Sequence, residues 1–540
     1  MLQRHDEAVG RRQRGEVVVP GAPGHAGDGV TDVVGELGDG VVAAGIGYVG
    51  PGYRVSGGED LGERLDPHAV LGFRFDTHSA AHNIINATDI VDDLRLREVG
   101  LEYREMDLFS VAVFGDGRIV RFHRDVEHTV ASIAEVDPDE ARRYREWIHD
   151  AVPVVTAFRA GLDAGAGAWA NTRRLPGRAR ASAAALRRNG GPLGLARLLL
   201  SPYGRVLRER FDSDLVRGPV SAFAAHASAS PNQPGSALFA LWQAFYHQVG
   251  QWHAVGGSQG LTDALAGRLA ASGGEWRTGA AVARITCRDG GVDGVELEDG
   301  EHLAADAVVT AVDPRTALLD LLDPPLDGAE AARLRAAHSG NAVQMLVLLA
   351  TTRLPAYGGA RPGDDAGLQS YVDTLDSLSA GFARAEARQL PEDPVPTYSF
   401  TPSALDTGLA PPGHHTVYLA TPTAPFEVDG GWDDVAEAFA DRMIDTVESR
   451  VPGFRSTIVG RAVRTPALMA SELRWPGAHP MYLDVSLDQL GPLRPTPALG
   501  RHRTPVRSLY VSGAGTAPVG GISGIPGRSA ARTLLRTMTG

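Results

Sequence analysis

The chain has 540 residues, which is too long for one compact core and favours two or three domains. Its apolar content of 43% and charged content of 22% are ordinary for a globular protein, so a large buried core is feasible. The formal net charge of −13, without a basic run interleaved with aromatic residues, argues against a nucleic-acid partner. All 52 basic residues are arginines, which excludes lysine Schiff-base chemistry.

Cysteine usage and hydropathy bear on the compartment. Cys287 is the only cysteine, so the chain can form neither an internal disulfide nor a cysteine-built zinc site. Residues 1–15 contain arginines, but the apolar segment of a secretion signal does not follow them. No apolar run reaches the roughly 20 residues needed to span a bilayer. We therefore expect a cytoplasmic protein that is soluble or peripheral to a membrane.

Two glycine-rich turns follow short valine-rich runs near the N-terminus. Residues 16–20 precede Gly21 and Gly24, and residues 41–44 precede a GxGxxG pattern at residues 45–50. Such a turn lets the backbone approach a phosphate when a helix begins directly after it. Glycines and prolines break any helical pattern after both turns. Each turn is therefore either a phosphate-binding loop or a Gly/Val-rich segment without that role.

Residues 100–252 are rich in Ala, Leu and Arg and have helical periodicity with few strand signals. Within them, residues 193–200 (LGLARLLL) lie close to four arginines: Arg187, Arg188, Arg197 and Arg205. This segment predicts either a core-facing helix with solvated arginines, the interpretation we favour, or a helix that lies in a membrane interface.

Residues 253–315 predict a segment of helix and sheet. Apolar residues recur at helical spacing from Leu261 to Leu269, and the pair at residues 273–274 (Gly-Gly) ends that helix. Asp-Gly pairs at residues 289–290 and 299–300 predict two tight hairpin turns. The continuously apolar run at residues 307–312 predicts a strand that is covered on both faces within a central parallel sheet.

Residues 508–535 (SLYVSGAGTAPVGGISGIPGRSAARTLL) predict an apolar strand, a glycine-dense turn and an amphipathic helix. Without Cβ atoms in the way, backbone N–H groups of the turn and of the helix N-terminus can face a ligand. The positive end of the helix suits an anion or the ribityl chain of a flavin.

This block resembles the C-terminal flavin signature of the phytoene desaturase-like family of FAD-dependent oxidoreductases, in the amine-oxidase superfamily. Four further blocks resemble the family in the family's own order: residues 72–88, 255–285, 411–426 and 487–495. The resemblance covers the chain from about residue 72 to its end. It is specific because several blocks agree in order and spacing, whereas one glycine motif alone would be a weak signal.

The resemblance implies an α/β protein with a discontinuous FAD-binding Rossmann-like domain and an inserted mixed α+β substrate domain. The FAD-binding segments are expected at residues 1–99, 253–315 and 491–540. The substrate domain is expected to consist of residues 100–252, its helical part, and residues 316–490.

Residues 1–71 are atypical for this family. Its first βαβ unit needs a glycine turn, a helix, and an acidic residue that holds the adenosine ribose. The resemblance instead begins abruptly near Gly72. We hypothesise that residues 1–71 are an altered front end, for example a frameshifted reading or a misassigned start. Resequencing the gene and finding no other frame that encodes the strand, GxGxxG turn and helix would exclude this hypothesis.

The resemblance also implies which residues contact FAD: Gly513, Gly515, Thr516, Gly520, Gly521, Ile522, Val282, Gly21 and Gly24. The C-terminal glycines have an alternative role in tight strand-to-helix packing, and Val282 has one as an ordinary hairpin residue. Two family-like blocks add residues that either face the flavin or its substrate, or only shape a loop: Asp76, His78, His82, Gly256 and Gly257.

No catalytic residue and no metal site are predicted. A flavin accepts hydride from carbon without an elaborate acid–base apparatus, so the lack of a recognisable triad is no objection to an enzyme. His414, His415 and His479 do not have the spacing of metal ligands.

We expect an FAD-dependent oxidoreductase that dehydrogenates an apolar, polyene or isoprenoid-like small molecule, as in carotenoid biosynthesis. Five residues either line a lipid tunnel or belong to the core: Phe239, Leu241, Trp242, Phe245 and Tyr246. One alternative is a carotenoid isomerase or ketolase. The other is a non-catalytic relative that has lost FAD binding through its altered N-terminus.

Overall fold

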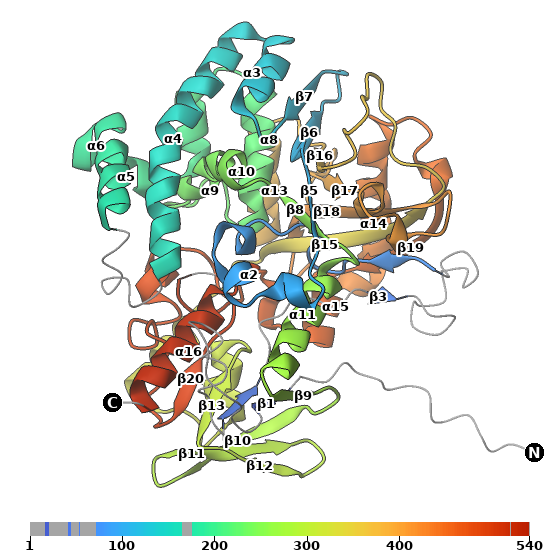
Figure 1. Ribbon diagram of the computed structural model, residues 1–540. Coiled ribbons are helices and arrows are strands. Elements are labelled where there is room, and N and C mark those ends of the chain that lie inside the picture. The colour runs from blue at the N-terminus through green and yellow to red at the C-terminus, as the bar shows by residue number, and fades with distance from the viewer. Residues whose placement is uncertain are drawn as a thin grey trace, which may run out of the picture.

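The computed structural model describes residues 17–20, 41–44, 53–54, 72–164, 175–518 and 520–538. Gly21, Gly24 and the GxGxxG turn at residues 45–50 lie outside these residues. The described chain forms a lower part with two sheets and an upper part with a helical bundle and one large sheet (Figure 1).

A five-stranded sheet gathers strands from distant parts of the chain. Their order is β20 (Leu509–Val511), β13 (Ala307–Thr310), β2 (Val41–Ala44), β1 (Val17–Pro20) and β9 (Gly274–Arg277). Strand β13 is parallel to both β2 and β20, which confirms the predicted return strand. Strands β1 and β2 pair antiparallel, whereas the strands of a βαβ unit are parallel. The discontinuous α/β fold is confirmed, and the boundaries between its domains stay a prediction.

A second sheet continues from the same region. It consists of β12 (His302–Ala304), β11 (Gly291–Leu297), β10 (Val282–Arg288) and β14 (Leu322–Asp323). The two predicted hairpins connect β10 to β11 and β11 to β12. The predicted helix before them is α11 (Ser258–Ala271), and α12 (Gly328–Ala336) follows β14.

The helical stretch begins later than the sequence predicts. Three short strands come first: β5 (Tyr103–Glu105), β6 (Ser110–Val113) and β7 (Ile119–Phe122). Strands β6 and β7 form a local antiparallel hairpin, whereas β5 pairs with the distant β8 (Trp252–Ala254) and β6 also pairs with the distant β16 (Leu368–Ser370). Local composition cannot reveal such partners, because strand pairing is a tertiary contact.

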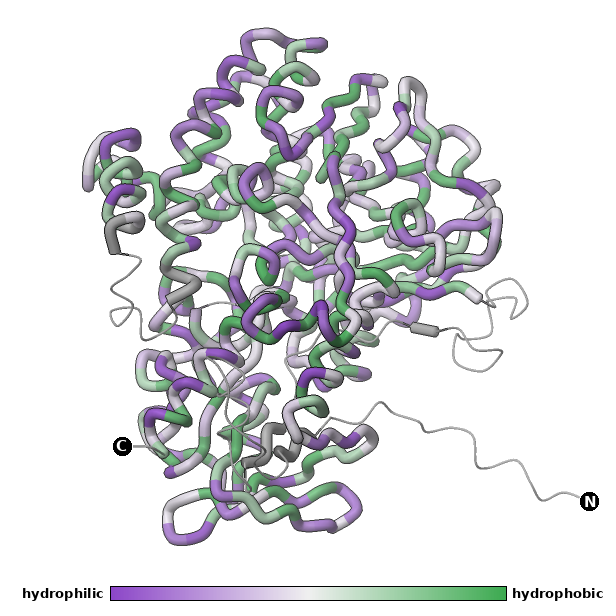
Figure 2. The backbone as a smooth tube through the Cα atoms, viewed as in Figure 1, coloured by the Kyte–Doolittle hydropathy of each residue, from purple (hydrophilic) through white to green (hydrophobic). Residues whose placement is uncertain are grey.

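Eight α-helices then follow among the described residues of the range 126–249. They are α3 (Val126–Ala134), α4 (Pro138–Ala164), α5 (Leu175–Arg188), α6 (Gly191–Leu200), α7 (Tyr203–Arg210), α8 (Asp214–Ala224), α9 (Ala237–Leu241) and α10 (Gln243–Val249). Hydrophilic and hydrophobic residues alternate along the outer helix α4 (Figure 2), as an amphipathic helix requires.

The seven-stranded sheet has the order β19 (Ile458–Arg464), β15 (Ala342–Thr351), β18 (His415–Pro425), β17 (Tyr398–Phe400), β16, β6 and β7. Its central strands β15 and β18 are buried on both faces. Val347 and Leu349 pack in a cluster with α14 (Trp432–Glu448), and Leu346 and Leu348 pack in the cluster of the helical bundle. The sheet is therefore the middle layer of this part.

The remaining elements are β3 (Tyr53–Arg54), β4 (Arg74–Phe75), α2 (Ile90–Asp93), α13 (Leu375–Glu386), α15 (Pro466–Leu473) and α16 (Ile525–Met538). Within the described ranges, no helix has both the length and the hydropathy of a membrane-spanning segment.

Candidate functional site

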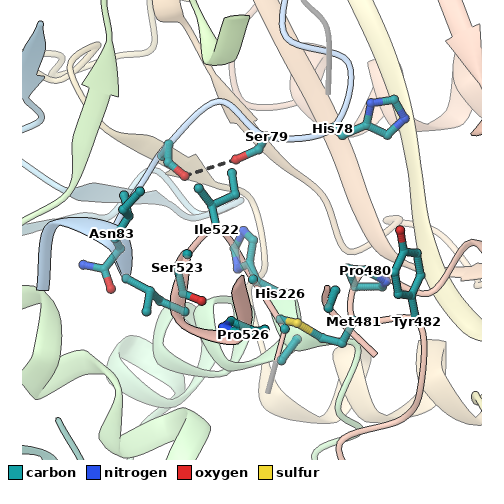
Figure 3. Close-up of a pocket in the computed structure, with 18 of the residues that line it drawn as sticks. His78, Ser79, Asn83, His226, Pro480, Met481, Tyr482, Ile522, Ser523 and Pro526 are labelled. Carbon is teal, nitrogen blue, oxygen red and sulfur yellow. Dashed lines mark hydrogen bonds between the residues drawn. The ribbon is translucent and has the colours of Figure 1, made fainter. Parts of the chain in front are cut away.

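A cavity of about 630 Å³ lies between the two parts of the molecule. At one end it is lined by residues of the turn that joins β20 to α16 and by residues 78–81, 83 and 84 (Figure 3). At the other end it is lined by side chains of α8, α9, β17 and β18. The cavity thus connects the C-terminal glycine block with the helical bundle and the large sheet.

The N-terminus of α16 opens on this cavity. Ser523, Gly524, Pro526 and Gly527 all line it, and the Ser523 hydroxyl accepts a hydrogen bond from the Ile525 amide at 3.2 Å. A Cβ atom added to Gly527 would meet nothing within 4 Å, so open space lies beside this turn of the helix. The positive end of the helix favours an electron-rich ligand there. The polar edge of a flavin has this character, so the residues present fit FAD.

Packing within the protein accounts for two glycines of the block. Gly513 has φ +82°, and a Cβ atom there would lie 2.3 Å from the carbonyl oxygen of Ala311. At Gly515 a Cβ atom would lie 2.5 Å from Cδ of Pro314. These glycines let the strand–turn backbone pass close to the end of β13, which is the packing role that the sequence left open.

The predicted FAD contacts fall into three groups. Four of the six predicted residues of the C-terminal block line the cavity: Gly513, Gly520, Gly521 and Ile522. Gly515 and Thr516 lie behind the lining, where the Thr516 hydroxyl donates to the Gly513 carbonyl at 2.9 Å.

The third group comprises Val282 and two residues that the structure does not describe. Val282 begins β10, pairs with Leu297 of β11 and packs beside Ile285, away from the cavity lining. Gly21 and Gly24 lie outside the described residues. All nine residues stay predictions as FAD contacts.

A buried arginine fixes the loop that faces the glycine block. Arg494 is fully buried, and its guanidinium donates to five backbone carbonyls: those of Met481, Leu483, Asp484, Gln489 and Ala514. Burial lowers the pKa of Arg494 to about 10, so it is still a cation at neutral pH. One side chain thus ties residues 481–489 to the turn at Ala514.

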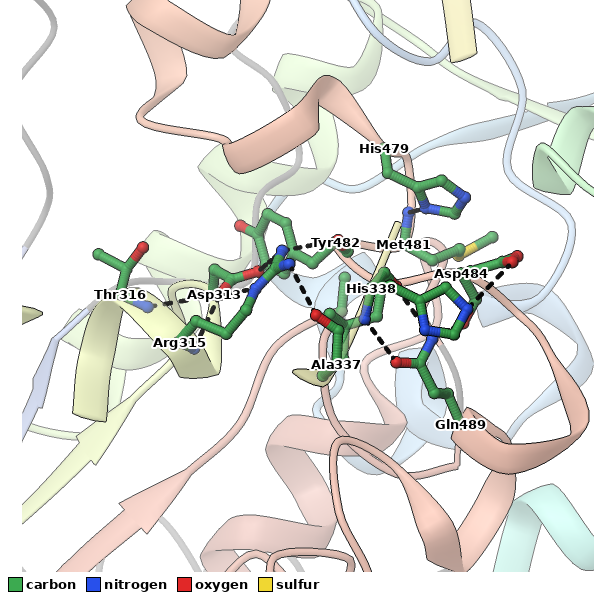
Figure 4. Close-up of polar contacts among 12 residues, drawn as sticks. Asp313, Arg315, Thr316, Ala337, His338, His479, Met481, Tyr482, Asp484 and Gln489 are labelled. Atoms are coloured by element: carbon green, nitrogen blue, oxygen red, sulfur yellow. Dashed lines mark hydrogen bonds and ion pairs between the residues drawn. The ribbon is translucent and has the colours of Figure 1, made fainter. Parts of the chain in front are cut away.

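A second arginine holds the same loop from the other side. Arg315 pairs with Asp313, Nη2 to Oδ2 at 2.9 Å, and donates to the Tyr482 carbonyl at 3.2 Å (Figure 4). Gln489 accepts from the His338 amide at 2.8 Å. Met481 and Tyr482 therefore reach the cavity from a rigid loop.

The block at residues 72–88 contributes both to the cavity and to α11. His78 lines the cavity and makes an edge contact with Trp475, and burial lowers its pKa to about 3. Asp76 and His82 instead contact the first residue of α11. The Asp76 carboxylate accepts from the Ser258 amide at 2.7 Å, and His82 Nε2 lies 3.0 Å from the Ser258 hydroxyl. Burial raises the pKa of Asp76 and lowers that of His82 to about 3.

Gly256 and Gly257 lie at the same place and line a separate cavity of about 300 Å³. A Cβ atom on Gly257 would lie 2.8 Å from Oδ1 of Asp76, so this glycine makes room for the carboxylate that caps α11.

The far end of the large cavity is aromatic. Of the five predicted tunnel residues, Phe239, Trp242 and Tyr246 line it, whereas Leu241 and Phe245 are buried in the core. Strands β17 and β18 add three aromatic residues that the sequence analysis missed: Tyr398, Phe400 and Tyr418. The alternation of Tyr398 and Phe400 could have indicated a shared strand face.

Charged groups are scarce around this cavity. Among the lining residues that the structure describes there is no Asp or Glu, and Arg528 is the single arginine. Nη1 of Arg528 lies 3.5 Å from Oδ2 of Asp93. The described parts of the chain also contain no group of three or more His, Cys, Asp or Glu residues placed to hold a metal ion.

A discontinuous α/β sheet, with a glycine turn and a helix N-terminus opening on an apolar cavity, defines the class of FAD-dependent oxidoreductases. The family model described as flavin containing amine oxidoreductase matches residues 73–522, and the chain belongs to this family. The match begins next to Gly72, where the sequence resemblance begins.

Known relatives agree with this assignment. Pyridine nucleotide-disulfide oxidoreductase domain-containing protein 2 of Mus musculus is 29% identical over 531 residues, covering 90% of this chain and 88% of the relative. A phytoene desaturase (lycopene-forming) of a Paracoccus species is 29% identical over 298 residues, 55% of this chain and 57% of that protein. The crystal structure of an oxidoreductase from Methanosarcina mazei has a TM-score of 0.54 at 15% identity and covers 87% and 89% of the two chains. The protein is an FAD-dependent oxidoreductase.

Proposed function

We propose that this enzyme dehydrogenates an uncharged, apolar small molecule of the polyene or isoprenoid class. The observation that carries the proposal is the lining of the large cavity, which is largely aromatic and aliphatic and includes no Asp or Glu among the described residues. A phytoene desaturase among the relatives supports the choice of a polyene.

The lining argues against a cationic amine as the substrate. Transfer of an ammonium group into an apolar cavity is costly unless a carboxylate or several hydrogen-bond acceptors replace its water shell. The only ionised side chain of the described lining is the guanidinium of Arg528, which would repel an ammonium group. A hydrocarbon has no charge to desolvate, and its transfer into such a cavity is favourable by roughly 25 cal/mol for each Å² of apolar surface removed from water.

The residues of the chain position the cofactor and the substrate and exclude water from the cavity. Gly520, Gly521 and the first turn of α16 would hold the cofactor, and the loop fixed by Arg494 covers it with Met481 and Tyr482. Bound FAD supplies a two-electron acceptor for hydride lost from carbon. The aromatic end, with Phe239, Trp242 and Phe400, then orients an extended apolar chain toward the glycine block.

The test is a single-turnover experiment without oxygen. FAD-loaded protein is mixed with a polyene in detergent micelles, and the absorption of the polyene and the flavin is recorded together. Dehydrogenation converts a carbon–carbon single bond to a double bond, so we expect a red shift of the polyene and an equivalent loss of oxidised flavin absorption. A primary amine of similar size is the comparison and should leave the flavin oxidised.

A matched pair of variants localises the effect. Phe239→Arg places a second cation in the cavity and should abolish the red shift, whereas Trp276→Arg on the exposed strand β9 should leave it unchanged. A polyene change without flavin reduction would indicate an isomerase instead. Flavin reduction by the amine alone, or a protein that stays colourless after FAD is added, would overturn the proposal.

A further inference from the structure

Helix α6 is apolar on all sides and yet lies at the surface. Of its ten residues (GPLGLARLLL), only Arg197 is charged, and none is buried. Leu193 is 86% exposed and Leu200 is 55% exposed. A helix that is hydrophobic all round normally lies inside a protein or against lipid. Figure 1 places α6 with α5 at the edge of the molecule, outside α4.

The inner face of α6 is already occupied by the protein. Leu195, Leu198 and Leu199 pack against the large hydrophobic cluster of the helical bundle. The outer face presents Pro192, Leu193, Ala196 and Leu200, which are all exposed. The core therefore accounts for one side of the helix, and the outer side needs a separate explanation.

The charge around α6 indicates the kind of partner. Residues 175–210, which comprise α5, α6 and α7, contain eight arginines and one acidic residue, Glu209, whereas the whole chain has a formal charge of −13. Arg197 and Arg205 both pair with the Glu209 carboxylate, so one negative charge offsets only one of two positive charges. Arg180 and Arg187 are exposed on α5. Arg208 pairs with Asp376 and Arg210 pairs with Asp150, so the local excess of positive charge lies at α5 and α6.

The cavity lies directly behind this helix. The carbonyl of Leu200 accepts a hydrogen bond from the amide of Gly235 at 2.9 Å, and Gly235 lines the cavity. Helix α6 also packs on α9, whose residues Leu238 and Phe239 line the cavity. One layer of helix thus separates the exposed leucines from the space assigned to the apolar substrate.

We infer that α6, with Arg197 and the arginines of α5, docks the enzyme on the surface of a membrane that contains anionic lipid. The exposed leucines enter the apolar side of the headgroup region, and the arginines contact lipid phosphates. An apolar substrate dissolves in the bilayer, so docking places the cavity next to the membrane that contains the substrate. The inference that the enzyme docks on a membrane depends only on the surface of α6 and its surrounding charges. The statement that the membrane supplies the substrate rests on the proposed function.

The test uses the full-length, FAD-loaded protein and lipid vesicles. Sedimentation with vesicles of phosphatidylcholine and phosphatidylglycerol should capture the protein, and pure phosphatidylcholine vesicles should capture much less. Raising the salt concentration should weaken capture because it screens the arginines. The double variant Leu193→Glu with Leu200→Glu should lose capture about tenfold or more, since two carboxylates replace the inserting groups.

Met538→Glu is the matched control, because Met538 is 52% exposed at the far end of α16. It should bind vesicles like the unaltered protein. The melting temperature and flavin spectrum of the double variant should be unchanged, because both leucines are exposed. Equal capture by both vesicle types, no capture at all, or full capture of the double variant would overturn the inference.

Activity separates this inference from the proposed function. With polyene carried in anionic vesicles, the double variant should turn over about tenfold more slowly, whereas with polyene in detergent micelles it should match the unaltered protein. If no polyene reacts in either form but vesicle capture still depends on Leu193 and Leu200, the proposed substrate is wrong and the docking surface stands.

Discussion

Helices α11 and α16 each lie downstream of a Gly-Gly pair, and their N-termini have different partners. Helix α11 follows Gly256 and Gly257, and the carboxylate of Asp76 accepts a hydrogen bond from its first amide. Helix α16 follows Gly520 and Gly521, and its first turn faces a large cavity with only the neutral hydroxyl of Ser523 as a local cap. The protein itself satisfies the positive end of α11, whereas that of α16 opens on the large cavity.

The difference shows what a glycine turn before a helix can mean. At α11 the glycine at 257 makes room for a protein carboxylate. At α16 the glycine of the first helical turn, Gly527, borders open space, whereas a Cβ atom on Gly520 in the preceding turn would lie 2.8 Å from Sδ of Met481. The same local pattern therefore predicts a helix start in both places, and a cofactor site in only one. Four predictions test this contrast, beginning with the largest effect.

The first prediction concerns the turn that leads to α16. Gly513→Ala should lower the free energy of unfolding by about 2–4 kcal/mol, because the new Cβ would collide with the Ala311 carbonyl at positive φ. Thermal melting measures the loss. Gly527→Ala in the same block should melt no lower than the unaltered protein, since its Cβ meets nothing. Equal melting of the Gly513→Ala variant would show that the turn can relax.

The second prediction concerns the arginine that holds the α16 turn against its covering loop. Arg494→Lys should weaken FAD binding about tenfold and lower stability by about 1–3 kcal/mol, since an ammonium group with three donors cannot satisfy five buried carbonyls. Flavin fluorescence titration and thermal melting measure the two effects. Arg501→Lys, at an exposed position nearby, is the control and should change neither. Normal FAD affinity in a destabilised Arg494→Lys protein would limit Arg494 to a structural role.

The third prediction concerns two buried histidines: His78, which lines the large cavity, and His82, which contacts the start of α11. Burial lowers each pKa to about 3, so between pH 6.5 and 3 the unfolded chain binds protons that the folded protein does not. Stability should therefore fall as pH falls below 6.5, by about 1.4 kcal/mol per pH unit for each histidine. Denaturant unfolding at several pH values measures the slope. His82→Gln should reduce that slope, and an unchanged slope would contradict the assigned pKa.

The fourth prediction concerns the α11 cap. Asp76→Ala should cost about 1 kcal/mol, because the Ser258 amide loses its acceptor. The flavin spectrum should stay the same, since Asp76 lies outside the lining of the large cavity. Asp263→Ala, an exposed change on α11, is the control for melting. A loss of bound flavin in the Asp76→Ala protein would show that the two helix ends are coupled.

Much of the fold could be predicted from local patterns. The hairpins at residues 289–290 and 299–300, the strand at residues 307–312 and the strand–turn–helix at residues 508–535 all follow from turn chemistry and hydrophobic periodicity. Strand β5 was missed because its partner β8 lies far along the chain, whereas the hairpin of β6 and β7 was missed although Asp116-Gly117 lies in its turn. A pattern can report a helix or a hairpin, since the stabilising contacts are near in sequence.

The site was predicted to a smaller extent. Gly513, Gly520, Gly521 and Ile522 line the cavity, but Tyr398, Phe400 and Tyr418 do so too and were not predicted. The paired role of Asp76 and Ser258 could not be read from the chain either, because 182 positions separate them.

The sequence by itself determined the class of the protein, because a glycine turn before a helix and several ordered blocks are local and additive signals. Only the tertiary structure decided which helix end faces the large cavity and which aromatic residues line it. It also decided that the leucine-rich helix α6 has an exposed outer face. The reason is that burial and the pairing of polar groups depend on what packs against a residue, and those neighbours come from anywhere in the chain.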